Sequence, residues 1–478
     1  MTDTNVLLVI MDSVRARNCS LLDHNNETTP NLNSLADEAT VYTQARSPGT
    51  WSLPSHTSIF TGLHVEEHNI RRAHHRHTGR TFWDEIPHRT GVFSENMWIT
   101  DMGVGLEDPF DDIYGQQNVL FQEALDPGNF SLSEGQGEYM KYLKRCLSHS
   151  HPLKSALNGL YIKTAWDYPQ LLPDGHTTGT PAGVYTDLFI DWIDERTGGW
   201  AACINYMDAH LPYEPESEFD EWDDGTARKL QEDCDDQVWS FNAGEKPVWQ
   251  MCSFEALYDG AIAQIDHEVN RLVDALKIRG KWDDTLLIVT ADHGEGFGEP
   301  SEVRHNAIIT GHGAGIHELQ LHVPLLVKFP GQETGTSHDK PVSLTDTPHV
   351  VRAAVDNDWE TDEYVTGDPV LASSHGLEEP MEKRANKFIN DLWLYNGDYR
   401  ALYTDRGDHV EKQISWRDEY ESVVDVYGAQ VSRIKRGESA SRVRDAFAEL
   451  TDASVRDSAS EIDISGATEQ RLEDLGYL

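Results

Sequence analysis

The chain has 478 residues, and its 82 acidic and 39 basic residues give a formal net charge of −43 at pH 7. Such a surface repels nucleic acids and anionic membranes, so we expect neither as a partner. Acidic residues are spread along the whole chain and lysine is scarce. This pattern resembles proteins adapted to a high-salt cytoplasm, where screening removes most of the self-repulsion.

The cysteines indicate a reducing compartment. Their number is odd and none forms a Cys-x-x-Cys pair, so we expect no disulfide framework among Cys19, Cys146, Cys203, Cys234 and Cys252. The apolar run at 6–11 is too short for the core of a signal peptide and lacks a basic flank. No apolar stretch has the length of a membrane span. We therefore expect a cytoplasmic protein without a membrane span.

The first predicted element is a buried strand at residues 5–12. Its run of Val, Leu, Ile and Met is typical of a strand that is covered on both faces of a parallel sheet. The run ends in Asp12, and ligands of open α/β sheets gather at the carboxyl ends of the strands. Asp12 is therefore a candidate site residue. Residues 30–39 are predicted to form the next helix, opened by Thr29 and Pro30.

The segment 47–62 runs from an irregular stretch into a predicted helix that begins near Pro54, because proline suits the first turn of a helix. Ser52 lies at or just before this start, where free N–H groups and the helix dipole favour an anion. Its hydroxyl could attack a sulfuryl or phosphoryl group. The alternative is that Ser52 and Ser55 are ordinary N-cap residues.

A basic segment, Arg71–His77 with Arg80, follows in this acidic chain. It is either a solvated loop or a rim that attracts an anionic substrate. Residues 105–180 are rich in glycine, proline and acids, and residues 214–250 are acidic and irregular. We interpret both segments as insertions into the main domain.

Two further buried strands also end in aspartate. One leads into Asp208-Ala-His210 and the other into Asp292-His293. A single aspartate after a strand is often only a turn former. Three of them, two with a neighbouring histidine, suit a divalent cation, which could polarise a sulfate or phosphate oxygen.

The remaining elements complete one large and one small unit. Residues 254–278 carry apolar residues at helical spacing, so one face of this helix should pack on the sheet. Gly-His312-Gly could supply a general acid or a donor to the anion. Residues 323–329 are a fourth strand, and short strands with Gly/Asp turns begin near residue 366. We predict a main domain at 1–365 and a C-terminal subdomain at 366–478.

Over most of its length the chain resembles the sulfatase family of the alkaline phosphatase superfamily. Ser52-Leu-Pro-Ser-His56 is similar to the family signature Cys/Ser-x-Pro-Ser-Arg. Several more motifs occur in the family's order and at compatible spacings: the strand 5–12, Thr29-Pro-Asn-Leu32, Thr61-Gly62, Tyr258 with Asp266, Thr290-Ala-Asp-His-Gly-Glu295, and Val323-Pro-Leu325 with Pro330-Gly331.

The resemblance implies an alkaline-phosphatase-like α/β/α sandwich with a large, mostly parallel sheet and a small C-terminal α+β subdomain. It implies one divalent metal ion held by Asp12, Ser52, Asp292 and His293, with Ca²⁺ expected in a sulfatase and Mn²⁺ or Zn²⁺ in a phosphatase. Candidate catalytic residues are Ser52, His56, His210 and His312. Candidate substrate-binding residues are Asn96, Asp208, His210 and His312.

Four features depart from the family pattern. The Asp-Asn pair of many sulfatases is Asp292-His293 here, as in phosphate- and phosphonate-cleaving relatives. The arginine of the signature, which belongs to the signal for converting the nucleophile to formylglycine, is His56. The usual second aspartate of the first motif is Ser13, and the segment 94–100 lacks the expected Gly-Lys-Trp-His. These departures argue against formylglycine at Ser52.

We therefore predict a metal-dependent sulfuric ester hydrolase that uses Ser52 or its formylglycine form. The alternative is a phosphomonoester or phosphodiester hydrolase, or a phosphotransferase, that uses an unmodified Ser52 alkoxide. A third hypothesis, from a different class, is a non-catalytic protein that binds an anionic glycan. The expected substrate is a small anionic ester, such as a sulfated or phosphorylated sugar or headgroup.

Overall fold

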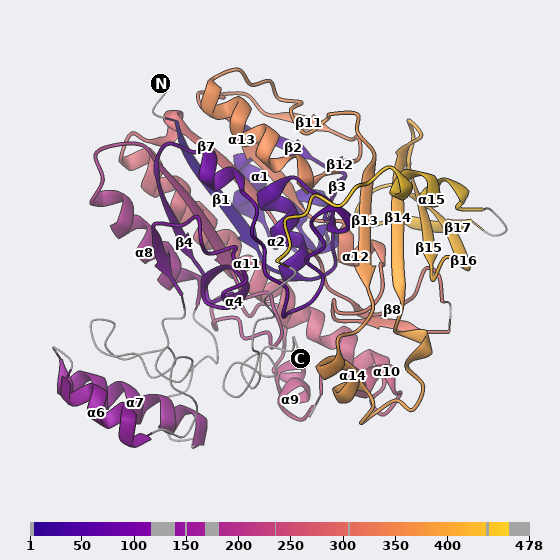
Figure 1. Cartoon of the computed structure of the whole chain (residues 1–478), viewed down its shortest axis with the longest axis horizontal. Helices are drawn as coiled ribbons and strands as arrows, with labels where there is room; N and C mark the ends of the chain where they lie inside the picture. The colour runs from indigo at the N-terminus through magenta and orange to yellow at the C-terminus, as the bar shows by residue number, and fades with distance from the viewer. Residues whose placement is uncertain are drawn as a thin grey trace.

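The computed structural model describes residues 4–115, 139–148, 151–167, 181–234, 236–304, 306–435 and 439–457. Its centre is an eight-stranded mixed sheet (Figure 1). The strands in spatial order are β11 (Thr336–His338), β2 (Thr40–Tyr42), β10 (Leu325–Lys328), β7 (Thr285–Thr290), β1 (Asn5–Met11), β6 (Trp200–Tyr206), β4 (Arg89–Phe93) and β5 (Asp112–Tyr114). All neighbouring strands are parallel except β10, which is antiparallel to β2 and β7.

The three central strands are the ones that the apolar runs predicted. Every residue of β1, β6 and β7 is buried, as continuous Val, Leu and Ile runs require when helices cover both faces of a sheet. In the parallel register Ile10 of β1 lies opposite Thr290 of β7, and Met11 lies opposite Tyr206 of β6. The carboxyl ends of these three strands therefore meet at one edge of the sheet.

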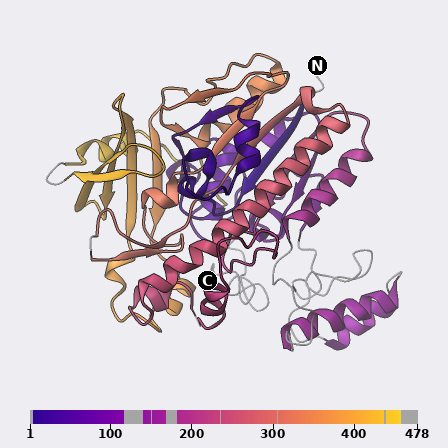
Figure 2. The ribbon, with the colours of Figure 1, turned by 180° about the vertical axis from the view of Figure 1, so that it is seen from behind.

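Helices cover both faces of this sheet. On the face seen in Figure 2 lies the long helix α11 (Val248–Ile278), against which α1 (Pro30–Leu35) and α8 (Ala182–Asp194) pack. On the opposite face, α2 (Ser52–Thr61) and α13 (Thr347–Asp356) lie together. The predicted α/β/α layers are present. The helix predicted at 254–278 begins six residues earlier, directly after Pro247, which supplies its N-cap residue.

The C-terminal part forms a second, antiparallel sheet. Its order is β13 (Val370–His375), β14 (Asp398–Asp405), β15 (Val410–Trp416), β16 (Tyr420–Val426) and β17 (Ser432–Lys435). The helix α15 (Ser441–Ala448) packs on β14 and β15. The small α+β unit is thus present, while the boundary at 365/366 stays a prediction.

The other elements are short or lie in the predicted insertions. Part of the segment 105–180 lies outside the described residues, and its described part contains β5, α6 and α7. The segment 214–250 was expected to be irregular but contains the two short helices α9 and α10 and the start of α11. These remaining elements are α3 (Val65–His68), α4 (Met97–Thr100), α6 (Tyr139–Ser148), α7 (Pro152–Asp167), α9 (Thr226–Glu232), α10 (Trp239–Asn242), α12 (Glu318–Leu321), α14 (Glu379–Ala385), β3 (Ala45–Arg46), β12 (Val342–Ser343), β8 (Phe297–Pro300) and β9 (Ile308–Thr310).

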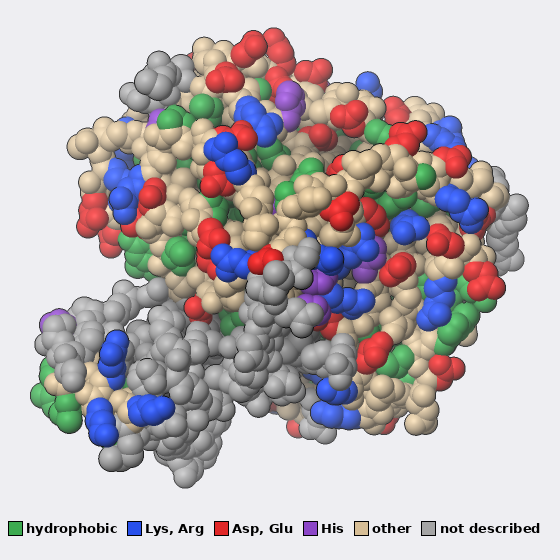
Figure 3. Space-filling model, viewed as in Figure 1, with side chains coloured by type: hydrophobic (Ala, Val, Ile, Leu, Met, Phe, Trp, Pro, Cys, Tyr) green, Lys and Arg blue, Asp and Glu red, His purple; other side chains and the backbone are tan. Residues whose placement is uncertain are grey.

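The surface carries the charge that the composition predicts. Acidic side chains are scattered over the visible face rather than collected in one patch (Figure 3). Among the described residues, no helix combines the length and the apolar character needed to cross a bilayer.

Candidate active site

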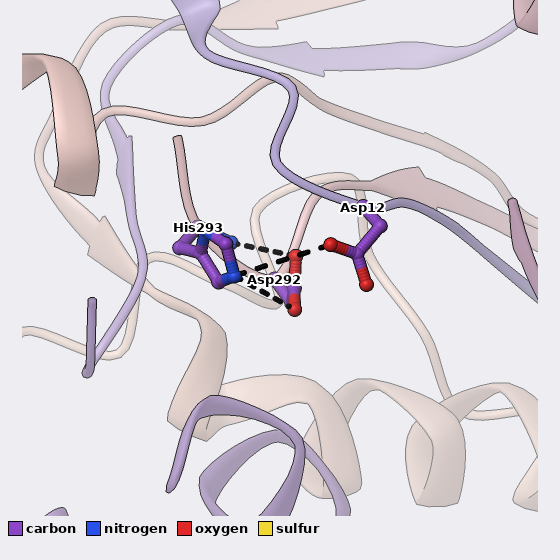
Figure 4. A group of neighbouring side chains, drawn as sticks. All are labelled: Asp12, Asp292 and His293. Carbon is purple, nitrogen blue, oxygen red and sulfur yellow. Dashed lines mark hydrogen bonds and ion pairs between the residues drawn. The ribbon is translucent and has the colours of Figure 1, made fainter. Parts of the chain in front are cut away.

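The carboxyl ends of β1 and β7 bring together residues from distant parts of the sequence. Asp12 directly follows β1, and Asp292 and His293 follow β7 after one further residue. All three side chains are fully buried, and their ligating atoms lie within 4.8 Å of one another. Figure 4 shows them pointing toward a common centre. His293 Nε2 lies 3.3 Å from Asp292 Oδ2 and 4.0 Å from Asp12 Oδ1.

The second nitrogen of His293 determines how the ring is protonated. His293 Nδ1 lies 3.0 Å from the carbonyl oxygen of Gly294, which can only accept a hydrogen bond, so Nδ1 carries the proton. The lone pair of Nε2 then faces the two carboxylates. Burial, with a contribution from the nearby His312, lowers the pKa of His293 to about 3, so the ring is neutral at neutral pH.

These residues fit a divalent cation. Asp292 Oδ2 is buried and accepts no hydrogen bond from any described residue. Two buried carboxylates beside a neutral imidazole leave negative charge uncompensated, which is costly in a protein interior. Two carboxylate oxygens and an imidazole nitrogen are a donor set that Mn²⁺, Zn²⁺ and related ions accept.

Ser52 is positioned by the start of α2. The helix begins at Ser52, two residues before Pro54, and Trp51 occupies the N-cap position, so Ser52 is not the cap. Ser52 is fully buried and its Oγ lies 3.4 Å from His293 Nε2. The start of this ten-residue helix thus lies beside His293, and backbone N–H groups at a helix start can bind anionic oxygens.

His56 lies one turn after Ser52 and connects α2 to the carboxylates. Its Nδ1 donates to the carbonyl oxygen of Ser52 at 2.8 Å, and its Nε2 lies 2.9 Å from Asn205 Oδ1. Asn205 Nδ2 in turn donates to Asp12 Oδ2 at 3.2 Å. His56 Nδ1 also lies 3.5 Å from Asp292 Oδ2. The structure therefore places His56 behind Ser52, where it contacts the helix start, Asn205 and the carboxylate of Asp292.

Two polar residues hold Asp12 in place. Asn96 Nδ2 donates to Asp12 Oδ2 at 2.9 Å, while Asn96 Oδ1 accepts from the Trp98 backbone N–H and so caps α4. Ser13 Oγ donates to Asp12 Oδ1 at 3.1 Å, and its backbone N–H donates to Asp292 Oδ1 at 3.2 Å. Ser13 has a φ of +63°, a left-handed conformation that turns the chain between these two contacts.

His312 and Glu295 form a pair beside His293. His312 Nδ1 lies 3.1 Å from Glu295 Oε2, and the His312 ring centroid is 4.3 Å from that of His293 and 5.1 Å from that of His210. Burial raises the pKa of Glu295 to about 7 and lowers that of His312 to about 3. The pair can therefore hold a single proton near neutral pH.

His210 and Asp208 differ in where they point. His210 lies beside His312, with its Nδ1 2.9 Å from the carbonyl oxygen of Leu211. Asp208 instead accepts from the Ala182 N–H at 3.1 Å and from Gln264 Nε2 at 2.6 Å, and burial raises its pKa to about 6. Asp208 thus ties α8 to α11 and is not a member of the Asp12 group.

Comparison with known proteins identifies the family. A family model described as Sulfatase matches residues 4–356, which is most of the chain. The chain belongs to the sulfatase family. A sulfatase of Formosa agariphila is 22% identical over 385 residues, which span 71% of this chain and 67% of the relative. An arylsulfatase of Clostridium perfringens is 22% identical over 371 residues, which span 72% of this chain and 73% of the relative.

Solved structures show the same fold. The phosphonate monoester hydrolase SpPMH from Silicibacter pomeroyi superposes with a TM-score of 0.61 at 17% sequence identity, covering 93% of this chain and 94% of that chain. The predicted fold and the predicted sulfatase-family ester hydrolase are therefore confirmed. The roles of the individual site residues remain predictions.

Three residues that complete the site were not among the predicted ones. Asn205 is the single side-chain amide inside the otherwise apolar run of β6, and that exception is a usable sequence signal. Glu295 ends the motif that begins at Thr290, so its position was already marked. Ser13 occupies the position at which the family pattern has its second aspartate, and this departure is the sequence signal for it.

Proposed function

We propose that the protein hydrolyses the sulfate monoester of a small alcohol, with Ser52 as the nucleophile. The observation that carries this proposal is the convergence of Ser52, Asp12, Asp292 and His293 at one end of the sheet, with Ser52 at the start of a helix. A nucleophile there faces both a donor set for a cation and the free N–H groups that hold an anion.

Each surrounding residue has a task in this reaction. The first turn of α2 binds the equatorial oxygens of the ester anion and orients it for in-line attack by Ser52. His56 holds the Ser52 carbonyl oxygen and so fixes the start of the helix. His312, oriented by Glu295, and its neighbour His210 are placed to give a proton to the leaving alcohol.

Asp12, Asp292 and His293, together with Ser52, would hold one divalent cation. The bound cation would polarise the ester oxygens and favour the deprotonated form of Ser52. We expect Ca²⁺ for a sulfatase and Mn²⁺ or Zn²⁺ for a phosphatase. The imidazole of His293 among the ligands suits Mn²⁺ or Zn²⁺ better than Ca²⁺, which prefers oxygen ligands.

A second candidate reaction is hydrolysis or transfer of a phosphate ester by an unmodified Ser52. Two observations favour it: His56 replaces the arginine of the maturation signal, and His293 adds a nitrogen ligand. The phosphonate monoester hydrolase with the same fold supports phosphorus chemistry on this scaffold. A serine alkoxide can attack phosphorus without oxidation to formylglycine.

The test is hydrolysis of an aryl sulfate, an aryl phosphate and an aryl phosphodiester by protein from its native host. The assays contain molar salt with Ca²⁺, Mg²⁺, Mn²⁺ or Zn²⁺, and the control is Ser52→Ala. Sulfate turnover that disappears in the variant supports the sulfatase. Turnover of a phosphorus ester alone supports the second candidate. The mass of the peptide containing Ser52 reports any oxidation, and a protein that turns over none of the three esters contradicts both candidates.

The proposal also includes the setting of the enzyme. The net charge of −43 supports function in a salt-rich cytoplasm, because screening there removes the self-repulsion of the acidic surface. A small anionic ester is the expected partner, and neither nucleic acid nor a membrane surface suits this charge. Activity that rises with KCl up to the molar range tests the salt adaptation.

A further inference from the structure

A pocket opens directly beside the proposed proton donors. His210 and His312 line its inner end, next to the Asp12 group. Its walls are largely apolar and include Trp51, Trp239 and Met381. In the proposed reaction the leaving alcohol departs toward His312, so this pocket is where the organic part of the ester lies.

Arg71 lines the same pocket, and its guanidinium interacts with Glu66 and Asp398 only at longer range, through their charge. No described residue accepts a hydrogen bond from its guanidinium or forms an ion pair with it, although Nε is buried. The nearby acid Glu66 is engaged by His375 at 3.4 Å and by Arg400 at 3.7 Å. Burial lowers the pKa of Arg71, which remains a cation because arginine titrates far above neutral pH.

The neighbouring arginines of the basic segment are used differently. Arg72 donates to the carbonyl oxygens of Gly376 and Leu377, Arg76 pairs with Asp108 at 2.7 Å, and Arg80 donates to the carbonyl oxygen of Asp84. Among the described residues the buried Arg304 also forms no ion pair, but its guanidinium lies over the rings of Tyr399 and Trp416, whereas Arg71 lines the pocket. Arg71 is thus available to bind an anionic group of a ligand.

A carboxylic acid lies in the same pocket. Glu378 Oε1 accepts from the Ala73 N–H at 2.7 Å, and burial raises the pKa of Glu378 to about 7. Such a group can exchange hydrogen bonds with hydroxyl groups in either direction. A second arginine of the pocket, Arg384, is paired with Asp236 at 2.7 Å. The pocket therefore offers Arg71 as the cation without an ion pair among the described residues, together with one hydroxyl partner and apolar walls.

We propose that the alcohol part of the substrate carries a second anionic group, a carboxylate or a further ester anion, which Arg71 binds. The carbon skeleton packs on Trp51, Trp239 and Met381, and Glu378 contacts a hydroxyl group. This inference rests on the proposed function, because it assigns the organic part of the same ester. It selects acidic alcohols, such as hydroxy acids and acidic sugars, over neutral ones.

The experiment compares two esters that differ only in charge. The monosulfates (or monophosphates, if those are turned over) of 3-hydroxybenzoate and 3-hydroxybenzamide have nearly the same shape. Wild-type protein should prefer the carboxylate by about tenfold or more in kcat/KM, since a charge-assisted hydrogen bond of 1.5–3 kcal/mol corresponds to roughly that factor. Arg71→Gln should bring the ratio close to one, mainly through KM.

Arg80→Gln is the matched control, because it removes the same charge from the same segment at an exposed position. It should keep the wild-type ratio. A wild-type ratio at or below one, or an equal loss in Arg80→Gln and Arg71→Gln, overturns the proposal.

The binding of the two alcohols separates this inference from the proposed function. If no ester is turned over, calorimetry with free 3-hydroxybenzoate and 3-hydroxybenzamide still tests Arg71. Tighter binding of the carboxylate that is lost in Arg71→Gln supports the inference even then. Equal affinities of wild type and variant for 3-hydroxybenzoate reject it.

Discussion

Replacing Asp292 by asparagine should abolish the stabilising effect of a divalent cation. Asp12 and Asp292 are both fully buried, and Asp292 Oδ2 accepts no hydrogen bond from a described residue. In the proposed metal site a bound cation would compensate the two charges of the wild type. Without a cation, Asp292→Asn removes one of the charges, and the new amide can donate to His293 Nε2, which lies 3.3 Å from the replaced oxygen.

The expected size follows from ligand linkage and chain length. A cation at 100 times its Kd stabilises the folded state by about 2.7 kcal/mol. A 478-residue chain has an unfolding entropy of about 1 kcal/mol/K if it unfolds cooperatively. Saturating cation should therefore raise the wild-type Tm by about 3 °C. Asp292→Asn should gain almost nothing from the cation, and in chelator its Tm should equal or exceed that of the wild type.

The assay is thermal unfolding with chelator and with each of Ca²⁺, Mg²⁺, Mn²⁺ and Zn²⁺, together with the metal content of the purified protein. Asp208→Asn is the control, because Asp208 is an equally strand-terminal, half-buried aspartate that hydrogen bonds to Ala182 and Gln264 instead. This variant should keep the wild-type response. A wild type that responds to no cation, or an Asp292→Asn variant that responds equally, would refute the metal site.

Three further predictions concern single positions. Burial and the neighbouring Asp368 raise the pKa of Asp346 to about 7. The folded state therefore keeps a proton that the unfolded chain loses near pH 4, so the stability of the wild type falls between pH 4 and 7. The increase in Tm caused by Asp346→Asn over the wild type should therefore be larger at pH 8 than at pH 5. Gly294→Ala would place a Cβ 2.0 Å from a backbone oxygen and should lower both stability and activity, whereas Gly198→Ala, with no atom within 4 Å, should be neutral in thermal unfolding. Ser13→Asp should tighten metal binding, measured as the chelator concentration that removes the ion, because it adds a third carboxylate; unchanged chelator resistance would contradict this.

The sequence predicts the central sheet well because its strands are defined by composition. A continuous apolar run bounded by turn residues has few alternatives to a strand covered on both faces, and β1, β6 and β7 match their predicted runs closely. The run does not determine where the next side chain points. Asp12 and Asp292 turn toward the common centre, whereas Asp208 lies two residues beyond β6 and turns toward α8 and α11.

The supporting residues could not be predicted from local pattern, because they act across the sheet. Asn205 matters because the register places it opposite Ile10, two residues before Asp12 on the neighbouring strand. Glu295 matters because the loop that carries His312 folds back so that the two side chains are in contact. No spacing in the sequence predicts this contact. Both interactions depend on tertiary packing, whereas Ser52 was found because a helix start has its own local chemistry.

Two of the departures from the family pattern, His56 and Ser13, are electrostatically consistent with one another. In the family signature an arginine accompanies a second aspartate, whereas here His56 accompanies Ser13. Replacing aspartate by serine removes a negative charge from the cluster, and Ser13 still joins Asp12 and Asp292 through neutral hydrogen bonds. A group with two carboxylates carries less negative charge than one with three, so a histidine can occupy the position of the permanently charged arginine. His56, 3.5 Å from Asp292 and hydrogen bonded to Ser52 and Asn205, can then serve as a donor that orients its neighbours. These two replacements therefore support the second candidate reaction, in which Ser52 would act without oxidation to formylglycine.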